Sequence, residues 1–253
     1  MTLILLCLQQ TKDLKCATRL LSKKFKKMSE PKKAIVRELG FRGLMHIPPM
    51  NVPHKLLKEL ANSFKLDKNT LETSYGSFKI KPKTIGDALG LNALGDLFPD
   101  KMSYKNLSEE NQLIFRRFQG NTLKQLTNEM MSIGVENEQN RLMFKRIFIL
   151  YIQMAFLLPS TITKVSPMHI APIFEMEKLT EGNWGAHVLN FIIKGITNFR
   201  LKKKKSIDGC LYALIIIYFH LAKNKEKKGE EKLLCPGLAT GTESSWLQEL
   251  EQR

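Results

Sequence analysis

The carboxy-terminal half of the chain contains three long segments that are apolar on almost every side. The first, Glu136–Leu158, ends in RLMFKRIFILYIQMAFLL and carries no charged residue after Arg146. Trp184–Phe199 and the segment that ends at Leu221 are nearly as apolar. A helix that is apolar on all sides is stable only where the rest of the protein surrounds it. The three segments therefore predict one buried helical core within residues 140–222.

The segments before this core alternate between amphipathic helices and turns. Serine or threonine caps, proline in the first turn and glycine after the last turn mark the helix ends. They predict helices over Thr11–Met28, from Ser29 to Gly40, after Asn51, over Lys83–Leu89, from Ser108 to Phe118 and over Thr122–Ile133. The last apolar helix is expected to open at Ser206 or Asp208, and Phe41–Met50 is expected to be a loop.

One segment has a different period. Apolar residues flank Tyr75-Gly76-Ser77, a pattern typical of a short β-hairpin. The predicted fold class is mainly α, a single multi-helix domain with a buried C-terminal helical core and one short β-hairpin near 70–81. We divide the chain into a basic helical amino-terminal segment (1–40), a helical domain (41–222) and a charged, poorly ordered tail (223–253).

The apolar segments do not predict secretion or a membrane location. Leu3–Leu8 has no basic residue before it and no small-residue cleavage site after it. Ile147–Thr163 is broken by Pro159, and Leu211–Ala222 has only 12 residues; a spanning helix needs about 20. An intracellular, reducing compartment follows, in which the four cysteines are free thiols, and no C-x-x-C pair indicates a zinc site or a redox role. The cysteines are Cys7, Cys16, Cys210 and Cys235.

The net charge of +16 is concentrated in two parts of the chain. Residues 1–40 carry a net charge of +7, and residues 200–232 carry +6. Such basic runs are typical of nuclear-import signals or phosphate-contact surfaces, although solvated helix faces and linkers show them too. The candidate residues are Lys23, Lys24, Lys26, Lys27, Lys202, Lys203, Lys204 and Lys205. The second run is the better candidate, because four cations between two apolar segments should lie in an exposed connection.

The sequence lacks the patterns of the common enzyme and metal-binding classes. No two histidines share helical spacing, and there is no H-E-x-x-H, no glycine-rich phosphate loop and no G-x-S-x-G. Cys210 begins an apolar helix, where thiols are usually inert. Zinc-finger, RNA-recognition and basic-zipper patterns are also missing. We therefore predict a protein that is not an enzyme, with no catalytic residues, metal or cofactor.

One stretch carries a resemblance to a known family. Gly40–Leu44 has the pattern Gly-Phe-x-Gly-Leu, a helix then ends at Phe64, a short ribbon follows, and Ile85–Leu91 closes on Gly-Leu. Over residues 14–222 the chain resembles the aminotransferase-like plant mobile domain. It is also similar to the related region upstream of ubiquitin-like (SUMO) protease domains in plant Mutator-like transposable elements. The resemblance implies a nuclear or transposon-derived protein without aminotransferase activity.

These observations predict a non-enzymatic module that acts in the nucleus by contacting a protein partner or chromatin. Two alternatives stay open. In the first, the chain is a direct, non-specific nucleic-acid binder that uses its lysine runs. In the second, it is the amino-terminal fragment of a transposon-encoded SUMO-protease-like protein that lacks the catalytic domain. The expected location is the nucleus, with the cytoplasm as the alternative. No membrane contact is expected, and the sequence predicts no oligomeric state.

Overall fold

The apolar segments of the carboxy-terminal half form three helices that share one hydrophobic core. They are α7 (Glu138–Ile152), α9 (Trp184–Arg200) and α10 (Tyr212–Glu226). Residues 147–158 are all buried, and α7 continues into a π-helical turn at Gln153–Leu157. The computed structural model describes residues 17–50, 54–99, 103–161 and 163–226. The predicted fold class, mainly α with a buried helical core, is confirmed.

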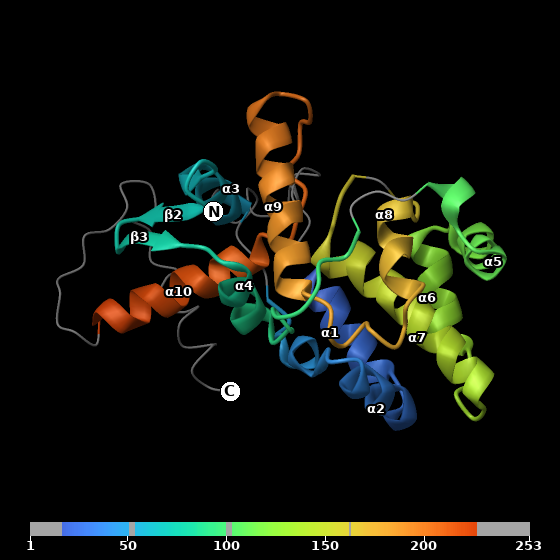
Figure 1. The fold of residues 1–253 in the computed structure, drawn as a ribbon. Coiled ribbons are helices and arrows are strands. Elements are labelled where there is room, and N and C mark those ends of the chain that lie inside the picture. The colour runs from blue at the N-terminus through green and yellow to red at the C-terminus, as the bar shows by residue number, and fades with distance from the viewer. Residues whose placement is uncertain (1–16, 51–53, 100–102, 162, 227–253) are drawn as a thin grey trace, which may run out of the picture.

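Helix α9 stands between two groups of elements (Figure 1). One group comprises α3 (His54–Ser63), α4 (Pro82–Leu89), α10 and a small sheet. The other comprises α1 (Thr18–Lys27), α2 (Glu30–Glu38), α5 (Glu109–Phe118), α6 (Leu123–Ser132), α7 and α8 (Pro167–Ile170). Within the first group α10 packs on α3 and α4, and α4 also packs on α9. Within the second, α2 and α6 pack on α7.

The basic amino-terminal helices belong to the same core as the rest of the described chain. Leu21 and Phe25 of α1 are buried, and the ring of Phe25 lies 6.3 Å from that of Phe148. Phe41 contacts Phe148 at 5.7 Å and Trp184 at 5.1 Å between ring centroids. A chain of aromatic contacts therefore joins α1, α7 and the first turn of α9.

The sheet has three short antiparallel strands in the order β1-β2-β3. They are β1 (Phe64–Lys65), β2 (Thr70–Thr73) and β3 (Gly76–Lys79), and Leu71 pairs with both Phe64 and Phe78. The hairpin predicted near 70–81 is present. Strand β1 is additional, since two residues are too few to show an alternating pattern. A two-stranded ribbon alone is marginal, and α3 packs against β1 and β2.

Most predicted helix starts agree with the structure. The hydroxyls of Ser108 and Thr122 accept the backbone N–H groups of Asn111 and Gln125, as N-caps do. The expected loop 41–50 contains one short 3-10 helix, Arg42–His46. The predicted starts at Thr11 and Asn51 and the tail beyond residue 226 lie outside the described residues.

The predicted start of the last helix was wrong. We expected Ser206 or Asp208 to open it, but α10 begins at Tyr212. Ser206 and Asp208 are buried in an irregular segment, and the Asp208 carboxylate binds the Lys204 ammonium instead of a helix N-terminus.

Two glycine turns meet backbone to backbone. A Cβ atom at Gly43 would lie 2.7 Å from the carbonyl oxygen of Leu89 and 2.7 Å from the Cα of Gly90. Gly90 itself ends α4 with φ of 65°, the left-handed region that glycine adopts without strain. Residue 43 must therefore be glycine, because the backbones of Gly43 and Gly90 lie too close for a side chain. This contact holds the 3-10 helix against the end of α4.

Gly43→Ala is expected to lower the free energy of unfolding by about 1–3 kcal/mol, because the new methyl group has only backbone atoms to displace. Urea denaturation of both proteins measures the change. Gly40→Ala is the control: Gly40 has φ of 82° but no atom within 4 Å of a Cβ, so only the left-handed strain of about 1–2 kcal/mol applies. A Gly43→Ala protein as stable as the native chain would show that the approach relaxes freely.

Candidate functional site

The first lysine run lies on the solvent-facing side of α1. Lys23, Lys26 and Lys27 are exposed and Lys24 is half-buried. The arrangement follows from the amphipathic pattern, since Leu21 and Phe25 turn the opposite side of the helix into the core. The run is thus part of one face of a short helix.

The second run forms a tight turn after α9. The backbone N–H groups of Lys203 and Lys204 donate to the Asn198 carbonyl at 2.9 and 3.3 Å, and Lys202 has a left-handed φ of 55°. Lys202, Lys203 and Lys205 are exposed, whereas Lys204 is half-buried and forms an ion pair with the buried Asp208 carboxylate. The turn therefore presents three of its four ammonium groups to solvent.

Contacts on both sides fix this turn in place. The guanidinium of Arg200 donates to the carbonyl oxygens of Ala61 at 2.9 Å and Asn62 at 3.0 Å, and to that of Phe64. A cation at these carbonyls, at the end of α3, is favourable because it opposes the negative end of the helix dipole. The Asp208 carboxylate also accepts the Thr161 N–H at 3.3 Å. The sequence alone assigned Arg200 no role, because its acceptors lie well over 100 residues away.

The structure does not bring the two runs together. Aromatic contacts place Phe25 of α1 near Trp184, at the beginning of α9, whereas the second run follows the end of that helix. A helix of 17 residues is about 25 Å long. Figure 1 shows the upper end of α9 far from α1. The runs are two separate basic surfaces.

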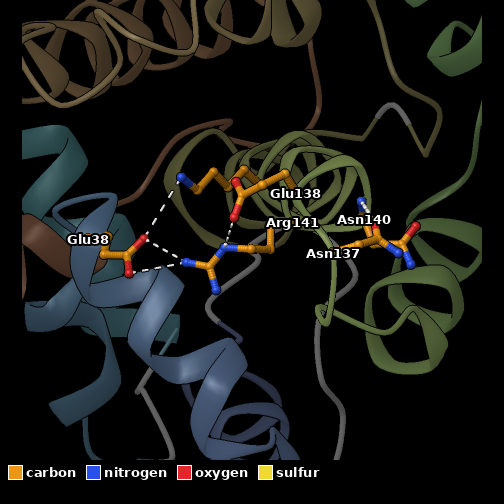
Figure 2. Close-up of polar contacts among 6 residues, drawn as sticks. Glu38, Asn137, Glu138, Asn140 and Arg141 are labelled. Carbon is orange, nitrogen blue, oxygen red and sulfur yellow. Dashed lines mark hydrogen bonds and ion pairs between the residues drawn. The ribbon is translucent and has the colours of Figure 1, made fainter.

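Several cations of the described chain form ion pairs with carboxylates, for example on α2 and α7. Figure 2 shows the Glu38 carboxylate of α2 facing the guanidinium of Arg141 on α7, and this ion pair measures 3.4 Å. The Lys145 ammonium lies 3.8 Å from the same carboxylate. Arg141 also lies 3.6 Å from Glu138. By contrast, Lys202, Lys203 and Lys205 form no ion pair with any described residue. Their charge is therefore available to an anionic partner.

The structure also gathers two histidines that the sequence did not connect. In the π-helical turn, the Gln153 side-chain amide donates to the His169 carbonyl at 2.9 Å, and its oxygen lies 3.4 Å from His187 Nε2. The Ser166 N–H donates to His169 Nδ1 at 3.1 Å. Burial, aided by the nearby His187, lowers the pKa of His169 to about 4. A neutral buried imidazole of this kind serves packing and hydrogen bonding.

No group of three metal-ligating side chains occurs among the residues that the structure describes. Over the same residues, every helix is too short or too polar to cross a lipid bilayer. Cys210 is buried at the approach to α10.

Comparison with known proteins gives one match. Residues 14–215 match a family described as a domain of unknown function, DUF8566. No curated protein matches the chain, and no solved structure matches it. The resemblance to the plant mobile domain therefore stays a prediction. Because the match covers most of the sequence, the chain belongs to the DUF8566 family.

Proposed function

We propose that this protein is a non-enzymatic interaction module that acts in the nucleus, and that its Lys202–Lys205 turn contacts an acidic protein partner. One observation carries the proposal: three exposed lysines without a described ion-pair partner sit at the projecting end of α9. The resemblance of residues 14–222 to the plant mobile domain supports the nuclear part of the proposal.

The anchoring of the turn supports its use as a contact. Arg200 and Asp208 tie its two ends to α3 and to the segment after the π-helical turn. A basic segment already held in one conformation loses less freedom on binding than a flexible one. Short lysine runs are also typical of segments that import receptors recognise through acidic surfaces. We therefore expect the acidic partner of this turn to be an import receptor.

Replacing Lys202, Lys203 and Lys205 together with glutamine is expected to lower the nuclear-to-cytoplasmic ratio to about one, because the basic segment is lost. The measurement is imaging of a fluorescent fusion large enough to prevent passive entry into the nucleus. The matched control replaces Lys23, Lys26 and Lys27 with glutamine, which removes the same charge from α1. Equal ratios for the native chain and both variants would contradict the proposal.

Direct nucleic-acid binding is the second candidate. The observation that favours it is the exposure of three lysines in each run. Because the runs lie apart, each would contact phosphates separately, and binding would weaken steeply as the salt concentration rises. DNA binding at low salt that both triple variants reduce equally would favour this candidate over a protein partner of the second turn. If the native chain does not bind DNA at low salt, direct nucleic-acid binding is excluded.

A further inference from the structure

A pocket of about 100 Å³ opens beneath the lysine turn, between α8 and the second half of α9. Its wall comes from four separate segments of the chain, which meet only in the folded protein. The polar lining residues used below are Ser160, Ser166, Lys194, Asn198, Lys204 and Asp208.

The charges around the pocket favour an anion. The charged residues among its lining are Lys194, Lys204 and Asp208. Asp208 is already satisfied by Lys204 and by the Thr161 N–H. Lys194 is exposed and forms no ion pair with a described residue. The lining therefore carries an excess of one positive charge, next to the Asn198 side-chain amide, a group that can donate hydrogen bonds.

Close backbone contacts fix the pocket before any ligand arrives. A Cβ atom on Gly195 would lie 1.9 Å from the Asp208 carbonyl oxygen, so α9 touches the 206–210 segment directly. The Gly209 N–H donates to the Pro159 carbonyl at 2.9 Å, which joins the two irregular segments. A pocket whose walls are held in this way needs little ordering on binding.

We propose that this pocket binds one small oxyanion through the Lys194 and Lys204 ammonium groups and the Asn198 amide. The volume of about 100 Å³ is several times the roughly 10–15 Å³ that one water molecule needs on the same measure. Inorganic phosphate or a small carboxylate therefore fits this space. The inference is independent of the proposed function, because it uses none of Lys202, Lys203 and Lys205.

Isothermal titration of the full chain with inorganic phosphate, and separately with acetate, tests the proposal at constant ionic strength. The native chain is expected to show saturable binding of at least one of the two, and the tighter anion identifies the ligand class. Lys194→Gln is expected to weaken that binding by about tenfold, and Lys194→Glu to abolish it, because a charged hydrogen-bond donor is lost and then reversed.

Lys203→Gln is the matched control, since it removes the same charge from the adjacent turn without touching the pocket. It is expected to change the affinity by no more than about twofold, because an exposed charge outside the pocket is screened. Lys194 is exposed, so its variants keep the fold, which circular dichroism verifies. No saturable binding by the native chain, or equal weakening by Lys194→Gln and Lys203→Gln, would overturn the proposal. Neither result bears on nuclear entry.

Discussion

Phe148→Ala is expected to lower the free energy of unfolding by about 3–5 kcal/mol, the largest single loss that we predict for this protein. Phe148 is completely buried in α7. Its ring lies 6.3 Å from Phe25, 5.7 Å from Phe41 and 6.2 Å from Phe144. These neighbours come from α1, from the turn after α2 and from α7 itself, so no single movement fills the space that the ring leaves.

Urea denaturation followed by circular dichroism measures the loss. Domains of this size are stable by about 5–15 kcal/mol, so the variant is expected to unfold at a much lower urea concentration. Leu142→Ala is the control on the same helix, since Leu142 is 37% exposed, and it should cost about 0.5 kcal/mol or less. If both variants lost the same small amount, α7 would not form the centre of the core.

The buried helices could be predicted because their composition alone determines their environment. The run Ile147–Leu158 has no polar face and contains only one amide side chain, that of Gln153. Every residue of the run is buried. Likewise, the caps Ser108 and Thr122 act on N–H groups three residues away, so local sequence contains the whole interaction. Fold class and most helix starts follow from such short-range patterns.

Contacts between distant segments could not be predicted in this way. Gly43 and Gly90 each read as an ordinary turn, and only the folded chain shows that their backbones meet. Asp208 looked like a helix cap, but the close packing of Gly195 against its carbonyl holds it beside Lys204. An acid four residues after Lys204 was the one local sign of that pair.

The candidate site also has one part that local sequence predicts and one part that depends on tertiary contacts. The sequence predicted an exposed run at 202–205 from its place between two apolar helices. Lys202, Lys203 and Lys205 are exposed, but Lys204 is half-buried. The pocket beneath them depends on the meeting of Ser160, Lys194 and Asp208, which no spacing in the sequence indicates. Surface charge is thus a local property, whereas a pocket is a tertiary one.

The stability of the protein is expected to fall between pH 7 and pH 5 because of His169. Its imidazole is neutral in the folded protein, where burial and the nearby His187 lower its pKa from 6.5 to about 4. In the unfolded chain the imidazole regains its ordinary pKa, so that state binds the additional proton first. The stabilisation is therefore complete above pH 6.5 and is lost as the pH falls towards 4.

From pH 7 to pH 5 the protonation of His169 is expected to lower the free energy of unfolding by about 2 kcal/mol, before most carboxylates begin to titrate. Urea denaturation at each pH measures the loss. His169→Asn keeps an acceptor for the Ser166 N–H that His169 Nδ1 binds but cannot titrate, so most of the loss should disappear. His46→Asn, at an exposed histidine, should retain it. A pH dependence that is identical in all three proteins would mean that the folded chain admits a charged imidazole at residue 169.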